Sequence, residues 1–502
     1  MNMRKWFVSL SVAAMAISAA LPAYAADSKT DSNITSFEET SLVKKDGTFW
    51  NWGDTKPVPT QVVALTDVER IISDSFIQKK DGTVWFYQPV YSWSPNKEKL
   101  FQLEGVHDLV QIVDGSLSHV AVDKAGHLYI IQTKNAEEAS VKPSALLDQV
   151  AAVSYYDQTI PRLEPPFEDY KVEGKWLFLR EDGTVWQNEG GQLDKVKQVP
   201  GLPKVTTLVN ELALAADGTV WRFPTQVAAG QSAAPVQWKG VSNIQQIYYN
   251  GVTTLAIDAN AKLWFLGGTV TGMSDGTQYH EGTPVQLKSM DKAKDAFVVE
   301  RSLIVWTTDN KVYRTSIENK QMPAHPKFEL LASDIVQIAP SYRHFFMEKK
   351  DGSLWGWGVN KNAELGYGDY EFMHTQPVPL HKPITVSLNG ETPQLSSGAM
   401  LRNGQAFVPL RSIFSKLGAE ISWDANTKTA TVEQKKDGKD SLTITIDMKT
   451  GATKLDGKPV ELQSAPFNIA GTAYLPLRFI SETLGAKVDW QQANNLISIT
   501  MK

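Results

Sequence analysis

The chain has 502 residues, a net charge of −5 at pH 7 and no cysteine. Its length exceeds what one compact core supports, so we expect two or more domains or a large repeat fold. The missing cysteines exclude disulfides, thiolate metal sites and a cysteine nucleophile, and the acidic balance argues against nucleic-acid binding.

An export signal comes first in the chain. Arg4 and Lys5 form a short basic start, residues 7–21 are apolar or small, and residues 23–25 read Ala-Tyr-Ala. This order is typical of a signal peptide over residues 1–25, cleaved before Ala26. We therefore expect a secreted, extracellular or cell-wall-associated protein with no transmembrane segment after cleavage. A secreted chain without cysteine fits a bacterium better than a eukaryotic secretory pathway.

One pattern then recurs: a turn of the Asp-Gly type, a small or polar residue, an apolar residue and an aromatic one. The eight copies lie at residues 46–50, 81–85, 125–129, 182–186, 217–221, 260–264, 309–313 and 351–355. Asp-Gly between two β-prone runs predicts a tight hairpin, because glycine adopts positive φ without strain. Alternating segments around each hairpin predict four short strands per repeat, which is the pattern of a propeller blade. The hairpin aromatics are expected to pack between blades.

The repeats resemble those of the regulator of chromosome condensation family. The best copy reads Asp-Gly-Ser-Leu-Trp-Gly-Trp-Gly-Val-Asn over residues 351–360, and the first keeps Phe-Trp-Asn-Trp-Gly over 49–53. The resemblance spans roughly residues 35–380 and implies a seven-bladed β-propeller, but eight hairpins leave the count open between seven and eight. In one arrangement the first hairpin completes the last blade and closes the ring. Residues 157–175 are expected to form a loop insertion on one rim.

A different, duplicated pattern begins at residue 384. Its halves are offset by 67 residues, as these pairs show: Pro409 and Pro476, Arg411 and Arg478, Gly418 and Gly485, Trp423 and Trp490. Each half is expected to form a β-hairpin, a short helix that ends at glycine, and a second β-hairpin. The predicted fold class is mainly β, with a propeller over residues 26–380 and a duplicated α+β domain over 384–502.

The second domain resembles the stalk domain at the N-terminus of some copper amine oxidases, which recurs in surface proteins of Gram-positive bacteria. The repeated Pro-Leu-Arg, Leu-Gly-Ala and tryptophan signatures carry this resemblance. It does not extend to the catalytic domain of that family. No histidine follows His381, so we expect neither a histidine copper site nor amine oxidation in this domain.

No catalytic constellation stands out. The eight histidines are scattered, and no nucleophile, phosphate-loop or dinucleotide motif occurs. We predict no catalytic residue, no cofactor and no metal site, with a metal assembled across blades as the weaker alternative. Arg411 and Arg478 are expected to make a duplicated structural salt bridge or carbonyl contact. Aromatic residues outside the repeat are the candidates for contact with a partner: Trp93, Tyr155, Tyr156, Phe167 and Tyr170.

Three functions remain open. The first is a non-catalytic secreted or cell-surface binding protein, whose propeller loops bind an extracellular protein or a cell-wall glycan and whose C-terminal domain is a stalk or attachment module. The second is a secreted inhibitor of an exported hydrolase, and the third is an extracellular propeller hydrolase or lyase. The absence of a catalytic constellation favours the first, since fold alone decides none of them.

Overall fold

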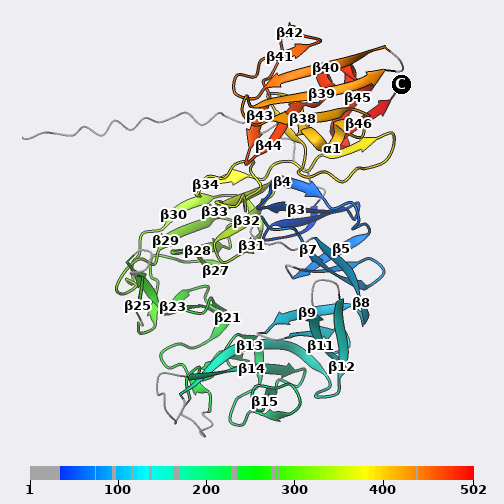
Figure 1. Cartoon of the computed structure of the whole chain (residues 1–502). Coiled ribbons are helices and arrows are strands. Elements are labelled where there is room, and N and C mark those ends of the chain that lie inside the picture. The colour runs from blue at the N-terminus through cyan, green and yellow to red at the C-terminus, as the bar shows by residue number, and fades with distance from the viewer. Residues whose placement is uncertain are drawn as a thin grey trace, which may run out of the picture.

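The computed structural model describes residues 34–501 apart from 74, 93–97, 116–117, 135–137, 162–169, 228–233, 273–276, 281 and 437–438. A ring of β-sheets surrounds a central opening, and a smaller domain sits at its edge (Figure 1). The ring strands end at residue 379 and those of the smaller domain begin at 385. The predicted signal peptide over 1–25 lies outside the described residues.

Eight four-stranded antiparallel sheets follow one another along the described part of the ring, each with its strands in chain order. The first strands are β1 (Ile34–Glu38), β5 (Val68–Ser73), β9 (Leu109–Asp114), β13 (Val150–Pro161), β17 (Val205–Val209), β21 (Ile244–Tyr249), β27 (Ala293–Val299) and β31 (Ile335–Pro340). The second strands are β2 (Ser41–Lys44), β6 (Phe76–Lys79), β10 (His119–Asp123), β14 (Tyr170–Arg180), β18 (Leu212–Ala215), β22 (Thr253–Asp258), β28 (Ser302–Thr307) and β32 (His344–Lys349). The third strands are β3 (Phe49–Gly53), β7 (Thr83–Gln88), β11 (Leu128–Lys134), β15 (Val185–Asn188), β19 (Val220–Arg222), β23 (Leu263–Gly267), β29 (Val312–Ser316) and β33 (Leu354–Val359). The fourth strands are β4 (Lys56–Gln61), β8 (Lys99–His107), β12 (Glu138–Ser144), β16 (Val196–Gln198), β20 (Val236–Gln237), β26 (Val285–Gln286), β30 (Glu329–Ala332) and β34 (Met373–Pro379).

The core of the ring lies between the sheets. Eight hydrophobic clusters each join two successive sheets, and one of them joins the last sheet to the first. The first strands of neighbouring sheets contact one another around the opening. This arrangement is a β-propeller, because each sheet buries both faces against its neighbours.

Ring closure differs from one arrangement that the sequence allowed. The first hairpin does not complete the last sheet, because β1 pairs with β2 and gives the first hairpin a sheet of its own. The ring is closed instead by side chains and by the backbone N–H of Asp54, which donates to the carbonyl of Asn362 at 2.5 Å. Trp52 packs on Phe346 with ring centroids 5.4 Å apart, and its indole N–H donates to the carbonyl of Glu364 at 2.7 Å.

The Asp-Gly hairpins join the second and third strands of each sheet, as predicted. In the first copy the Thr48 hydroxyl donates to Asp46 Oδ1 at 2.6 Å and accepts the indole N–H of Trp50 at 2.9 Å. The hairpin aromatics pack in the clusters between sheets, which confirms their structural role: Trp50, Trp85, Tyr129, Trp186, Trp221, Trp264, Tyr313 and Trp355. Trp50 is 1% exposed, whereas Trp186 is only partly buried.

The insertion expected as a loop over 157–175 is instead mostly an extension of a hairpin. β13 and β14 remain paired from Asp157 opposite Gly174 to Pro161 opposite Tyr170. The extension also bonds to the next sheet, because the N–H of Thr159 donates to the carbonyl of Thr225 at 2.8 Å. The β-prone residues Thr159, Ile160, Tyr170 and Val172 favour strands here.

The C-terminal domain has the predicted duplicated order of hairpin, helix and hairpin. Its elements are β35 (Thr385–Leu388), β36 (Met400–Arg402), β37 (Gln405–Pro409), α1 (Leu410–Phe414), β38 (Glu420–Asp424), β39 (Thr429–Lys436), β40 (Lys439–Asp447), β41 (Thr453–Leu455), β42 (Lys458–Val460), β43 (Phe467–Ile469), β44 (Thr472–Pro476), α2 (Leu477–Thr483), β45 (Ala486–Gln491) and β46 (Leu496–Met501). The halves meet where β37 pairs with β44, and one buried cluster fills the domain.

The two domains are docked through the outer strand of the first sheet. The Gln394 side chain accepts from the N–H of Val63 and donates to the carbonyl of Gln61, both at 3.0 Å. The N–H of Gly398 donates to Thr60 Oγ1 at 2.7 Å. A small apolar cluster of Val58, Met400, Phe407 and Tyr474 crosses the contact. The smaller domain therefore packs against the first sheet, next to the contact that closes the ring.

Candidate functional site

The two rims of the propeller differ in construction. Because the sheets are antiparallel and ordered along the chain, the Asp-Gly turns and the crossovers between sheets share one rim, here called the hairpin rim. The other rim, here called the loop rim, carries the connections between first and second strands and those between third and fourth strands. The long connections of the loop rim, where the structure describes them in whole or in part, span 89–98, 223–235, 268–284, 317–328 and 360–372. One of them carries the extra hairpin of β24 (Thr269–Thr271) and β25 (Gln278–His280).

Large apolar side chains are exposed on the loop rim. They are Val90 at 42%, Val172 at 50%, Tyr279 at 61%, Tyr342 at 69% and Phe372 at 63% exposed. The other exposed large apolar residues of the described ring occupy the first or fourth strands. Exposed aromatic residues that come from separate loops to one face are typical of a protein contact surface.

A cavity of about 140 Å³ opens on the loop rim at the closing contact of the ring. Its lining comes from the first, second and last sheets, and includes Asn51, Asp54, Lys56, Tyr91 and Glu364. We call it the seam cavity. Asp54 is held by Ser92, whose hydroxyl donates to it at 2.6 Å, and Glu364 accepts from Asn362 at 2.8 and 2.9 Å.

Lys56 is the unusual group in the seam cavity. It begins β4 and is 8% exposed. Its ammonium donates to Asn51 Oδ1 at 3.0 Å, and burial lowers the pKa of Lys56 against the opposing influence of the Glu98 carboxylate. A buried ammonium is costly for the fold. This lysine is therefore a candidate for contact with a ligand group that accepts hydrogen bonds.

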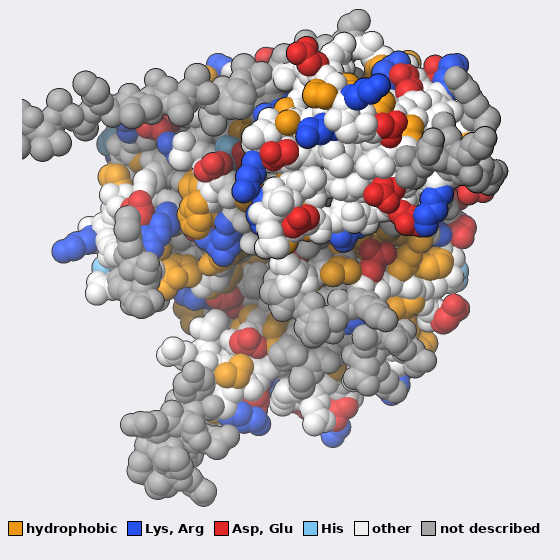
Figure 2. All heavy atoms as spheres, turned by 45° about the horizontal axis from the view of Figure 1, so that its top comes forward, with side chains coloured by type: hydrophobic (Ala, Val, Ile, Leu, Met, Phe, Trp, Pro, Cys, Tyr) orange, Lys and Arg blue, Asp and Glu red, His pale blue; other side chains and the backbone are white. Residues whose placement is uncertain are grey.

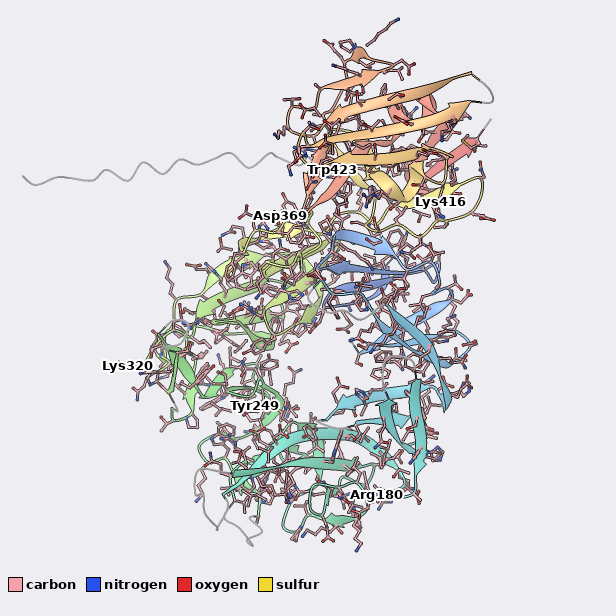
Figure 3. All side chains as sticks on the ribbon, viewed as in Figure 1. Arg180, Tyr249, Lys320, Asp369, Lys416 and Trp423 are labelled. Carbon is pink, nitrogen blue, oxygen red and sulfur yellow. The ribbon has the colours of Figure 1, made fainter. Side chains whose placement is uncertain are left out.

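A second polar group lies between the fifth and sixth sheets. Glu211 is 3% exposed and accepts from the Arg222 guanidinium at 3.3 Å. Burial, and then the Glu211 carboxylate, raise the pKa of the Tyr249 hydroxyl. Tyr249 lies at the inner side of the ring (Figure 3). The carboxylate is thus already paired, which favours a structural role.

The aromatic residues predicted to contact a partner do not form one patch. Trp93 and Phe167 lie outside the described residues, and Tyr170 begins β14. The Tyr155 ring packs on Trp176 at 4.8 Å, and its hydroxyl donates to Asp157 at 2.5 Å.

The prediction that Tyr156 contacts a partner is wrong. It is 4% exposed and packs between the fourth and fifth sheets, where its hydroxyl accepts from Gln187 at 3.0 Å. Successive strand residues point to opposite faces, so neighbouring tyrosines have different roles.

The C-terminal domain carries a separate pocket of about 450 Å³. The turn at Gly404 and Gln405, residues 461–463, helix α2 and strand β45 line it. Trp490 of β45 is 36% exposed at this pocket. We call it the stalk pocket.

The predicted duplicated arginine contact is wrong. Arg478 pairs with Glu482 at 3.6 Å, but Arg411 has Ser415 at the position that corresponds to Glu482. Both arginines are exposed. The repeat signature therefore marks the start of each helix without fixing a common partner.

Within the described ranges, no group of three or more His, Asp or Glu side chains is placed to hold a metal ion. No helix among the residues with described structure has the length and apolarity to cross a membrane.

Comparison with known proteins identifies the second domain. Residues 387–499 match the family described as copper amine oxidase N-terminal domain, which confirms the resemblance for this part of the chain. A curated protein named "Protease inhibitor" from Brevibacillus choshinensis is 29% identical over 116 residues, which are 22% of this chain and 32% of that protein. This chain therefore spans about a third of that relative.

Solved structures similar to this chain include RCC1-type proteins. The structure of Kap60 bound to yeast RCC1 (Prp20) has a chain with 13% identity and a TM-score of 0.39, covering 55% of this chain and 75% of that one. Human WBSCR16 shows 15% identity and a TM-score of 0.39, covering 59% and 89%. The computationally designed Ika8 protein shows 14% identity and a TM-score of 0.39, covering 66% and 97%. Nothing about function follows from similarities at this level.

Several candidate residues had no sequence signal. Lys56 stands in an ordinary strand, and Tyr342 and Phe372 lie in connections without a motif. Trp490 was visible as half of a repeated pair, but its partner Trp423 is equally exposed at 37% and does not line the stalk pocket.

Proposed function

We propose that this chain is a non-catalytic, exported binding protein in which an eight-bladed propeller holds an extracellular protein on its loop rim. One observation carries the proposal: the long connections, the exposed aromatic side chains and the seam cavity all occur on that rim. The hairpin rim consists of tight turns that bond to the next sheet. The C-terminal domain then serves as the stalk or attachment module.

Export is part of the proposal and has its own test. The basic, apolar and Ala-Tyr-Ala segments of residues 1–25 support cleavage before Ala26. N-terminal sequencing of protein recovered from the culture medium should begin at Ala26. Protein found only inside the cell, with Met1 retained, would contradict export.

Partner capture tests the binding surface. The immobilised mature chain should retain one or few proteins from extracellular material of the source organism, and the double variant Tyr342→Ala/Phe372→Ala should lose them. The matched control, Lys80→Ala/Lys350→Ala, alters two exposed residues beside hairpin-rim turns and should retain them. Equal capture by all three proteins would contradict the loop-rim assignment.

A second candidate function is inhibition of an exported protease. The similarity to the protein named "Protease inhibitor" favours it, and it is a special case of binding in which the partner is an enzyme. The mature chain should then slow casein hydrolysis by proteases of the same culture medium in a stoichiometric, saturable manner. Unchanged hydrolysis at a molar excess of the chain would remove this candidate and leave the more general binding function.

A further inference from the structure

The stalk pocket contains an acceptor that the protein itself leaves unsatisfied. Gln405 donates through its amide nitrogen to Gln463 Oε1, across the two sides of the pocket. Its own Oε1 is buried and has no hydrogen-bond partner among the described residues. A buried acceptor without a donor is costly, and proteins usually satisfy such groups. Because this oxygen is itself covered, the Gln405 side chain must turn before a ligand hydroxyl or N–H group in the pocket can satisfy it.

The same pocket offers a flat apolar surface. Val488 and Trp490 are two residues apart on β45, so both side chains lie on the face of the strand that lines the pocket. Val488 is buried, whereas Trp490 keeps 36% of its surface exposed. An exposed indole beside polar side chains is suited to a ligand that is apolar on one face and polar at its edge.

The charges of the pocket oppose a strongly ionic ligand. Arg478 and Glu482 come from the same helix and pair with each other at 3.6 Å, and Glu461 also contributes to the lining. Basic and acidic side chains are interspersed on the face of this domain that Figure 2 turns toward the viewer. A neutral ligand with several hydroxyl groups therefore fits better than a phosphate or a polycation.

We propose that the stalk pocket binds a hexose ring of a glycan. On binding, the Gln405 side chain turns so that its Oε1 accepts from a ring hydroxyl, and the C–H face of the sugar packs on the Trp490 indole. The pocket volume of about 450 Å³ lies in the range of small-molecule sites. An extended peptide would instead need alternating donors and acceptors along a strand edge. The site is independent of the partner on the loop rim.

The test uses the full mature chain and a matched pair of tryptophans. Saturation-transfer NMR with glucose, galactose, mannose, N-acetylglucosamine and their β-linked disaccharides should reveal binding by the wild type. Trp490→Ala and Gln405→Leu should each weaken it by about tenfold or more, as expected for loss of one stacked ring or one hydrogen bond. Trp423→Ala is the control, because Trp423 occupies the same place in the other half with 37% exposure.

Three outcomes would overturn the proposal. The first is no transfer to any of these sugars from a wild-type chain whose thermal transition is intact. The second is equal loss of binding in the Trp423 and Trp490 variants. The third is a pool of random peptides that binds the wild type but not Trp490→Ala, since the pocket would then be a polypeptide site. None of these outcomes bears on the loop-rim partner.

Discussion

Gly218 lies against the backbone of Asn243, so that a Cβ atom on Gly218 would come within 2.7 Å of the Asn243 Cα. Gly218 belongs to an Asp-Gly hairpin, and Asn243 precedes the first strand of the next sheet. The carbonyl of Gly218 also accepts the N–H of Ile244 at 3.0 Å. The same contact recurs around the ring, as in Gly47 with Val68 and Gly183 with Val205. The hairpin glycine thus connects one sheet to the next.

Gly218→Ala should therefore lower the free energy of unfolding by more than the strain of positive φ alone would. We expect about 2–4 kcal/mol, the sum of backbone strain and a forced shift at the sheet contact. Gly105→Ala is the matched control: its φ is +82°, close to the +79° of Gly218, but nothing lies within 4 Å of its Cβ position. It should cost only about 1 kcal/mol. Equal losses of stability in the two variants, measured by urea denaturation, would show that the contact between sheets contributes nothing to the effect.

The hairpin tryptophans should differ according to burial. Trp50→Ala, at a side chain that is 1% exposed, should destabilise the fold by about 3–5 kcal/mol. Trp186→Ala should cost clearly less, because this ring is only partly buried. Thermal unfolding of both variants checks the order. A larger loss for Trp186 would contradict burial as the cause of the difference, because both indoles donate to a threonine hydroxyl, Trp50 at 2.9 Å and Trp186 at 3.3 Å.

Lys56→Met should leave the fold as stable or make it more stable by about 1–2 kcal/mol, because it removes the desolvation cost of a buried charge. The same substitution should weaken binding of the loop-rim partner. Denaturation and partner capture, measured on the same preparation, separate the two effects. A destabilised protein with unchanged partner binding would show that Lys56 is a structural residue.

His381 should make stability depend on pH. It lies at the junction of the domains, where its backbone N–H donates to the carbonyl of Gly366 at 3.0 Å. Burial is the main cause that lowers the pKa of its imidazole below the usual 6.5. The folded state then binds the proton more weakly than the unfolded state.

The contribution of neutral His381 to stability should consequently be complete above about pH 6.5. It should fall as the pH drops toward the pKa of His381 in the folded state, by up to about 1.4 kcal/mol per pH unit. His381→Gln should make the melting temperature depend less on pH between about pH 7 and about pH 5. An unchanged pH profile in His381→Gln would assign the dependence to other groups.

Local signals in the sequence predicted the parts of the fold that depend on local chemistry. Turns of the Asp-Gly type, each followed by a small or polar residue, an apolar residue and an aromatic one, identified the hairpin between the second and third strands of each described sheet of the ring. They could do so because turn geometry and side-chain hydrogen bonds act over a few residues. The 67-residue offset likewise placed both helices of the second domain. The sequence did not reveal ring closure by Trp52 and Phe346, since these residues are far apart in the chain.

The candidate sites depended on contacts of the same non-local kind. Tyr155 and Tyr156 look equivalent in the sequence, but alternation along β13 buries the second between sheets. Trp423 and Trp490 look equivalent too, and only the surrounding segments decide which one lines a pocket. Lys56 is a surface residue by composition alone, and its burial follows from the meeting of three sheets.

Cross-linking of the captured complex tests the loop-rim proposal most directly, because exposed lysines mark both rims. Lys171 at the start of β14, Lys320 and Lys361 lie on the loop rim, and Figure 3 shows Lys320 at the edge of the ring. Lys45, Lys80, Lys124 and Lys350 lie beside the hairpin turns. Amine cross-linking and mass spectrometry should join the partner to the first group and leave the second group unlinked. Cross-links concentrated on the hairpin rim would contradict the proposal that the loop rim holds the partner.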